Sequence, residues 1–328
     1  MTIVLGLASS HSPNVSTVPE LWRLHADRDR RNPHLDFAGL AAAARPELAA
    51  ELSLEVFQRK HEACQAAIGR LAEAFVAADP DVVVVIGDDQ RELFRDECTP
   101  AFAVYTGRDL VDIPAEPETF DPSIRPALWA RHAAQTESYA TDPDFARALV
   151  QSLGARGFDM AVAGAQLPGR SLGHAFTFVR LRLMGAKTPP MIPVFINTYF
   201  PPNQPSPRRC WEFGRALRRA LDDGFGDRRV ALVASGGLSH FIIDEELDRR
   251  VLAAIMDGRS ETLGDLPADK LNGGSSEIRN WIAASAAMQD LAPKLLAYEP
   301  AYRSEAGTGC GMAFMRWEPP IAPAPRLG

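Results

Sequence analysis

The chain has 328 residues, of which 46% are hydrophobic and 23% charged, a composition that excludes disordered, collagen-like and disulfide-scaffold proteins. Its net charge of −7 provides no basic surface for a nucleic-acid backbone, and no apolar run approaches the roughly 20 residues that span a bilayer. We find no secretory signal, so we expect a cytoplasmic protein that binds neither nucleic acid nor membrane. The four cysteines form no CxxC pair, which predicts reduced thiols and no metal held by cysteine.

Short β-branched runs alternate with longer helical patterns along the chain. Strands buried on both faces read as continuous apolar sequence, and this alternation is typical of a parallel sheet. Strands are predicted at 3–8, 81–86, 101–105, 159–163, 191–197, 229–235 and 311–317. Helices are predicted at 54–77, 142–153, 174–183, 208–221, 244–256 and 275–288. We therefore predict an α/β fold with one mostly parallel central sheet flanked by helices on both faces.

The domain organisation is simple, because the chain has neither a fixed-period repeat nor a Gly/Ser-rich linker. Residues 1–317 are predicted to form one domain, and residues 318–328 a Pro-rich tail. Residues 19–45, rich in Arg, Asp and Ala, follow the first predicted strand as an insertion. Ligands of open α/β sheets bind beyond the carboxyl ends of the strands, so this insertion is either a lid over a site or a surface loop.

Polar residues follow four of the predicted strands, in the segments 9–13, 87–90, 166–174 and 236–240. Because these strand ends converge on one crevice, His11, His174 and His240 form the candidate constellation. Imidazole and carboxylate ligands with open coordination positions suit non-haem Fe(II). Glu277, where a Gly/Ser turn enters an apolar helix, is the candidate carboxylate, or else a first-turn Glu that stabilises the helix dipole. The remaining histidines are expected on the surface: His25, His34, His61 and His132.

Three short motifs in a fixed order carry a family resemblance: Ser-Ser-His-Ser-Pro around His11, Gly-Gly-Leu-Ser-His ending at His240, and Gly-Ser-Ser-Glu ending at Glu277. Together they resemble the class III extradiol ring-cleavage dioxygenases. This LigB-like family includes the catalytic subunit of protocatechuate 4,5-dioxygenase, gallate dioxygenase and 3-O-methylgallate dioxygenase. The resemblance extends from His11 to about Trp317. It implies an α/β catalytic domain, one Fe(II) on two histidines and one carboxylate, and O2-dependent opening of a catecholic ring.

Carried over to this chain, the resemblance makes His11 the first iron ligand and Glu277 the carboxylate ligand. It makes His240 the catalytic acid and base, and His174 a histidine behind the ligands that faces the substrate. A histidine that titrates near neutrality can take a phenolic proton and later return it, and each such step accelerates a reaction about 10²- to 10⁴-fold.

One position departs from the family pattern. The second His ligand should follow the second strand, where this chain has Asp88-Asp89-Gln90. Counting from the strand selects Asp89, counting back from Phe94 selects Gln90, and both stay open. An oxygen ligand at this position would shift the preference of the site toward Mn(II) or a more weakly held Fe(II). Alternatively, His61 supplies the missing imidazole, or the iron site is lost, as in the Memo-like relatives.

Most substrates of the family are aromatic acids, so an Arg that binds a carboxylate is expected. Arg303, before the last predicted strand, is the candidate, with a plain surface role as the alternative. Arg170 and Arg91 are weaker candidates. The partners implied are a small aromatic substrate and O2, with a homo-oligomer or a small partner subunit as in some relatives.

The expected function is therefore that of an Fe(II)-dependent extradiol dioxygenase that acts on a catecholic aromatic acid of the protocatechuate, gallate or 3-O-methylgallate type. One alternative is a divalent-metal hydrolase on the same fold that uses His11, Asp89 and Glu277. The other is a non-catalytic, Memo-like binding protein. Metal identity and O2 consumption separate these three functions.

Overall fold

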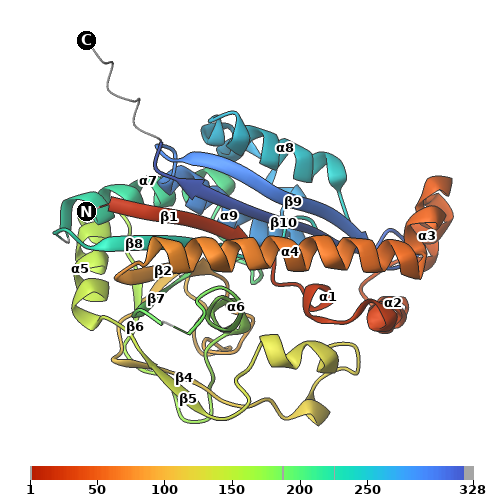
Figure 1. The fold of residues 1–328 in the computed structure, drawn as a ribbon, viewed down its shortest axis with the longest axis horizontal. Helices are drawn as coiled ribbons and strands as arrows, with labels where there is room; N and C mark the ends of the chain where they lie inside the picture. The colour runs from red at the N-terminus through yellow and green to blue at the C-terminus, as the bar shows by residue number, and fades with distance from the viewer. Residues whose placement is uncertain (1, 187, 225, 321–328) are drawn as a thin grey trace.

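The computed structural model describes residues 2–186, 188–224 and 226–320 (Figure 1). Its centre is an eight-stranded sheet with the order β6-β3-β7-β2-β8-β1-β10-β9. The strands, in that order, are Ala161–Ala163, Phe102–Tyr105, Met191–Ile196, Val82–Gly87, Arg229–Ser235, Thr2–Ser9, Gly309–Glu318 and Ala292–Tyr302. A separate antiparallel pair is formed by β4 (Asp109–Asp112) and β5 (Glu137–Ala140).

The four strands at the centre of the sheet, β7, β2, β8 and β1, run parallel to one another. On one side β10 is antiparallel to β1 and to β9, and on the other β3 is antiparallel to β7. The carboxyl ends of the four parallel strands therefore lie at one edge of the sheet, where the loops that follow them meet. This arrangement confirms the predicted α/β fold with a mostly parallel sheet.

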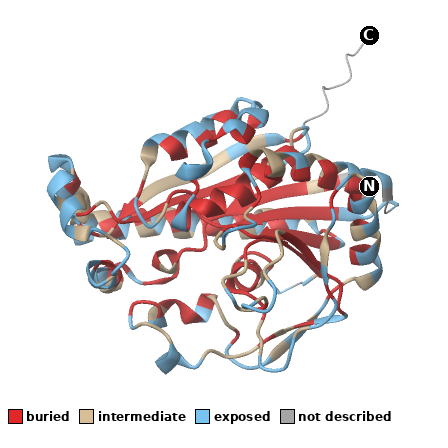
Figure 2. Cartoon of the chain, turned by 180° about the vertical axis from the view of Figure 1, so that it is seen from behind, coloured by how far each residue is buried: buried red, intermediate tan, exposed pale blue. Residues whose placement is uncertain are grey.

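Helices cover both faces of the sheet. On one face lie α4 (Leu54–Ala78) and α6 (His174–Arg182), and on the other α5 (Pro143–Gly154), α7 (Pro207–Gly224), α8 (Glu245–Met256) and α9 (Ile278–Ala287). Figure 2 shows the buried strands between these two helical layers. Alternate residues of β2 serve the two faces, because Val83 and Val85 pack with α4 and α6 while Val84 and Ile86 pack with α7 and α9.

The insertion after β1 is helical, which the sequence did not predict. After α1 (Pro13–Ser16), it contains α2 (Trp22–Arg30) and α3 (Phe37–Ala43). The fully buried Trp22 fixes the start of α2, since its indole N–H donates to the carbonyls of Asn14 and Thr17. The role of this insertion as a lid stays a prediction.

Short 3-10 helices complete the described chain: η1 Pro19–Leu21, η2 Pro46–Leu52, η3 Pro117–Thr119, η4 Arg125–Ala130, η5 Ser260–Asp265, η6 Ala268–Lys270 and η7 Gly273–Glu277. All four cysteines are free thiols, as expected. Within the described residues, no helix combines the length and the apolar composition that crossing a bilayer requires. Of the predicted Pro-rich tail, residues 321–328 lie outside the described residues.

Candidate metal centre

His11 lies directly after β1 and before α1, and only 3% of its surface is exposed. Its Nδ1 atom is 2.9 Å from the hydroxyl oxygen of Ser235, and that hydroxyl donates to the carbonyl of Ala175. Because the serine proton is used on Ala175, Nδ1 of His11 must donate, and its other nitrogen carries a free lone pair. This nitrogen, Nε2, is buried and has no hydrogen-bond partner.

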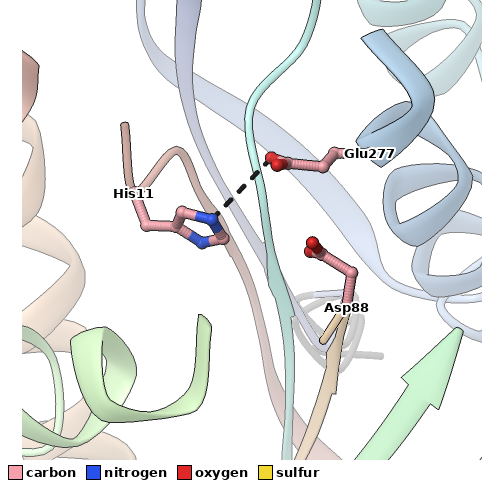
Figure 3. Close-up of side chains that lie close together, drawn as sticks. All are labelled: His11, Asp88 and Glu277. Carbon is pink, nitrogen blue, oxygen red and sulfur yellow. Dashed lines mark ion pairs between the residues drawn. The ribbon is translucent and has the colours of Figure 1, made fainter. Parts of the chain in front are cut away.

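Two carboxylates face this nitrogen from separate elements (Figure 3). Asp88 follows the last residue of β2, and Glu277 ends η7 at the start of α9. Nε2 of His11 is 3.8 Å from Oε2 of Glu277, and one ligand atom from each of the three residues lies within 4.8 Å of the others. All three side chains are at least 97% buried. One imidazole nitrogen and two carboxylates around a common point form a donor set for a divalent cation.

The electrostatics of His11, Asp88 and Glu277 also favour a cation. Burial lowers the pKa of His11 to about 3, so its imidazole is neutral at pH 7. Burial, together with the negative charges of Glu277 and Glu92, raises the pKa of Asp88 well above its usual value. Burial acts against the charge of Glu277, but the adjacent imidazoles of His240 and His11 lower its pKa to about 2. A bound divalent cation would relieve the repulsion between the two carboxylates and occupy the lone pair of His11.

His240 and Tyr199 lie beside the same carboxylate. Nε2 of His240 and the hydroxyl of Tyr199 are 3.3 and 3.2 Å from Oε1 of Glu277, and 3.3 Å from each other. The other nitrogen of His240 lies 2.9 Å from the carbonyl of Leu238 and therefore donates to it. Burial opposes a charge on His240, yet the adjacent carboxylate of Glu277 and the thiol of Cys310 raise its pKa well above the usual value.

Two glycines allow this close packing. Gly236, directly after β8, has a φ of 148°, and a Cβ there would lie 3.1 Å from the Cβ and from Oε2 of Glu277. Gly274 approaches His240 so closely that a Cβ would lie 2.1 Å from its imidazole ring. The glycines of both sequence motifs are therefore used to bring Glu277 and His240 together.

His174 begins α6 and stands edge-on to His11, with 4.8 Å between the ring centroids. Its Nδ1 atom and its backbone amide both contact Oε1 of Glu92. Burial acts against the charge of Glu92, but the adjacent His174 lowers the pKa of this carboxyl to about 2. Glu92 thus accepts the Nδ1 proton of His174 and directs the opposite nitrogen of the ring away from itself.

The carboxylate after β2 that joins the cluster is Asp88, and Asp89 is not part of it. The carboxylate of Asp89 accepts hydrogen bonds from the backbone amides of Leu93 and Phe94, at 2.8 and 3.1 Å. The amide of Gln90 lies at the edge of the cluster, 3.5 Å from both Asp88 and Glu277.

His61 lies within α4 and contacts Gln65, so it does not supply the missing imidazole. Alternation along β2 could have selected Asp88, because residues 84, 86 and 88 share a parity and α9 packs on the face of Val84 and Ile86. That inference requires knowing that the helix after Glu277 covers this face.

Arg303 is engaged by another side chain. Its guanidinium forms a two-pronged ion pair with Asp29 of α2, at 2.7 and 3.0 Å, and also donates to Asn14. Arg170 and Arg91 form ion pairs with Glu97 and Asp96, respectively. Each of the three predicted carboxylate-binding arginines therefore already contacts a carboxylate of the chain.

The cluster opens into a cavity of about 340 Å³, a size typical of small-molecule sites. The predicted residues His11, His174, His240, Gln90, Glu277 and Arg303 all contribute to its wall. So do residues that were not predicted as site residues, among them His25, Glu92, Arg131 and Tyr199. His25 was expected on the surface but is only 2% exposed, because α2 brings it against the cavity. Tyr199 and Glu92 follow β7 and β2, so their places after strand ends could have marked them, whereas His25 in α2 and Arg131 after η4 follow no strand.

Comparison with known proteins agrees with the three sequence motifs. A family model described as the catalytic LigB subunit of aromatic ring-opening dioxygenase matches residues 54–312, which is most of the chain, and this confirms the resemblance. The 2,3-dihydroxyphenylpropionate/2,3-dihydroxicinnamic acid 1,2-dioxygenase of Comamonas testosteroni is 29% identical over 161 residues, covering 49% of this chain and 43% of the relative. The protein of the same name from Mycolicibacterium smegmatis is 35% identical over 172 residues, covering 49% and 44%. Gallate dioxygenase of Pseudomonas putida is 49% identical over 41 residues, 12% of each chain. The chain thus matches less than half the length of each of these relatives.

Proposed function

Because this chain belongs to the family of catalytic LigB subunits of aromatic ring-opening dioxygenases, we propose that it is an extradiol dioxygenase that opens the ring of a catecholic aromatic acid with O2. The observation that carries the proposal is the buried, unpartnered Nε2 atom of His11, which faces the carboxylates of Asp88 and Glu277 at the wall of a ligand-sized cavity. The relatives that this chain matches are named for related substrates, 2,3-dihydroxyphenylpropionate and gallate.

The metal is held by His11, Asp88 and Glu277 in this proposal. A bound Fe(II), or Mn(II) as the alternative, would bind the catecholic substrate and activate O2 for ring opening. The usual facial triad of such oxygenases has two histidines and one carboxylate, whereas this chain offers one histidine and two carboxylates. Two oxygen donors make the site harder, which shifts its preference toward Mn(II) or a more weakly held Fe(II).

His240 is the proposed acid and base. Its Nδ1 proton is fixed on the carbonyl of Leu238, so proton transfer takes place at Nε2, the nitrogen beside Glu277. Against the effect of burial, the charge of Glu277 raises the pKa of His240, and a divalent metal bound to Glu277 would offset that charge. Nε2 could then accept the second hydroxyl proton of the substrate and return a proton later in the reaction. The hydroxyl of Tyr199, 3.3 Å away, holds the ring of His240 at this position.

His174 is the proposed hydrogen-bond donor to a hydroxyl of the substrate. Glu92 fixes its Nδ1 proton, which leaves the opposite nitrogen for a ligand in the cavity. Both His174 and Glu92 line the cavity, so a ligand there meets a histidine whose orientation is already set before binding.

The experiment that tests the function is O2 uptake by protein purified anaerobically and reconstituted with Fe(II). The substrate panel contains protocatechuate, gallate, 3-O-methylgallate and 2,3-dihydroxyphenylpropionate. We expect Fe(II)-dependent uptake with at least one catecholic acid, together with the yellow absorbance of a ring-opened product. If no member of the panel supports Fe(II)-dependent uptake, the dioxygenase function is wrong.

A divalent-metal hydrolase is the second candidate, because one histidine and two carboxylates form an oxygen-rich donor set that also suits Mn(II). Hydrolysis of aryl esters or amides under anaerobic conditions, in the absence of any O2 uptake, would favour this function. Purified protein that retains its fold but binds no divalent metal would instead favour a non-catalytic binding protein.

A further inference from the structure

The cavity wall carries two arginines that form no ion pair within the described residues. Arg28 lies on α2 and Arg131 directly follows η4, and both line the cavity. Among the residues that the structure describes, neither arginine forms an ion pair. The Nε atom of Arg131 is buried and has no hydrogen-bond partner. An unpaired guanidinium at a partly buried position costs free energy unless a ligand supplies the missing acceptor.

His25, one turn before Arg28 on α2, has a second unpartnered atom at this wall. It is 2% exposed, and its Nε2 atom has no hydrogen-bond partner. Burial, with the charges of Arg303 and Arg28, lowers the pKa of His25 to about 3. The ring is therefore neutral and can donate one hydrogen bond without adding charge.

The other charged groups beside His25 are already neutralised within the chain. Arg303 is paired with Asp29, and Asp121, which also lines the cavity, accepts from the amide of Ser123 and lies 3.9 Å from Arg31. Arg131 also interacts with the carboxylates of Glu92 and Glu277, but these are already bonded to His174 and His240, and Asp121 interacts with both Arg28 and Arg31. Among the described residues, the guanidinium groups of Arg28 and Arg131 nevertheless form no ion pair. This part of the cavity wall therefore favours an anion.

Structural arginines elsewhere in the chain are bonded differently. Arg279 is 3% exposed, and its guanidinium donates to the carbonyls of Pro205 and Leu271 at 2.8 and 2.7 Å. Arg303 is equally well satisfied by Asp29 and Asn14. Arg131 is half-buried at the cavity wall and its buried Nε atom has no acceptor, so its acceptor is expected from outside the chain.

We propose that His25, Arg28 and Arg131 form the subsite that binds the carboxylate of the substrate, in place of Arg303. This inference rests on the proposed function and assigns the residues that would determine its preference for an acidic substituent. A guanidinium fork matches a carboxylate with two parallel hydrogen bonds, and His25 adds a third donor at the same wall. The cavity holds this subsite and the metal ligands together, which lets one small ligand contact both.

The test is calorimetric titration of anaerobic, Fe(II)-loaded protein with three probes: 3,4-dihydroxybenzoate, the neutral 1,2-dihydroxybenzene, and benzoate, which lacks the hydroxyls. We expect Arg131→Gln to weaken binding of both acids about 10- to 100-fold and to leave binding of the neutral diol within about 2-fold. Arg28→Gln, at an exposed position, should weaken acid binding in the same direction. Arg23→Gln is the matched control, because Arg23 is exposed on the same helix and does not line the cavity.

Equal weakening of the acids and the neutral diol by Arg131→Gln would overturn the subsite, as would wild-type protein that does not bind either acid. Circular dichroism of each variant verifies the fold, and if Arg131→Gln is unfolded, Arg28→Gln decides alone. If benzoate binding depends on Arg131 while no catechol supports O2 uptake, the subsite stands and only the dioxygenase function fails.

Discussion

The Nδ1 atom of His11 lies 2.9 Å from the hydroxyl oxygen of Ser235, and this hydroxyl donates to the carbonyl of Ala175. The last residue of β8 thus selects the tautomer of a histidine that follows β1, its neighbour in the sheet. Partners of this kind orient metal-binding histidines and increase their affinity for the metal. The lone pair of His11 is directed at Glu277 and Asp88 because the serine has no proton left to give to the ring.

Ser235→Ala should therefore weaken metal binding while the three ligands remain. Loss of the acceptor leaves the Nδ1 proton of His11 unsatisfied and the ring free to change tautomer, so we expect about 10- to 100-fold lower affinity. Calorimetric titration of metal-free protein with Mn(II) measures the change. Ser285→Ala, which removes a buried hydroxyl from α9 that donates only to Ile282, is the control. Wild-type affinity in Ser235→Ala would show that the serine does not orient the ligand.

His240→Gln should retain the metal and lose turnover. The amide of Gln cannot accept a proton near neutral pH, so we expect turnover to fall about 10²- to 10⁴-fold. Glu277→Ala should instead lose the metal, because it removes a carboxylate from the cluster. Loss of metal and loss of turnover are separated by measuring the metal content and the O2 uptake of the same samples. The control variant is His34→Gln, at an exposed position. Metal loss in His240→Gln with metal retained in Glu277→Ala would reverse the two assigned roles.

Asp248 should give the stability of the metal-free protein a specific pH dependence. Its carboxylate accepts three hydrogen bonds of 2.8 Å, from the amide and hydroxyl of Ser239 and the hydroxyl of Tyr298. Burial nonetheless raises its pKa from 3.8 to about 6. The folded state holds this proton more tightly than the unfolded state. Protonation of Asp248 therefore makes its full contribution to the free energy of unfolding at pH values below the pKa of the unfolded state. This contribution is lost as the pH rises through the pKa of Asp248 in the folded state.

The measurement is urea unfolding of wild type and Asp248→Asn at several pH values after chelation. A shift of about two pKa units corresponds to ~3 kcal/mol, so the free energy of unfolding of wild type, relative to the variant, should fall by ~3 kcal/mol between about pH 4 and pH 6. A constant difference between the two proteins over this range would contradict the raised pKa.

Most strands of the sheet and the helices that cover it could be predicted, because each is marked by a local pattern in the sequence. The apolar run of β8 was predicted with the observed bounds, and the periodic α4 to within one residue. Strand β9 was missed because Pro293 and Pro300 interrupt its pattern. Both prolines are accommodated because β9 is at the edge of the sheet, where a missing N–H is tolerated.

The site was predictable only where motifs mark it. His11, His240 and Glu277 follow glycine- and serine-rich turns and lie together as expected. Asp88 was missed, because the predicted alternatives after this strand were Asp89 and Gln90 and only the position of α9 selects Asp88. Arg303 was predicted to bind substrate, but its partner Asp29 lies 274 residues away in the insertion, a contact that no local pattern encodes.

The metal affinity of Asp88→Asn compared with Asp89→Asn tests the central assignment most directly. The two variants remove one charge each from adjacent residues, and Asn at either position retains an oxygen that can accept a hydrogen bond. We predict one divalent ion per chain in wild type and in Asp89→Asn, and at least about 10-fold weaker binding in Asp88→Asn. Weaker binding in Asp89→Asn, with wild-type binding in Asp88→Asn, would contradict a metal centre formed by His11, Asp88 and Glu277.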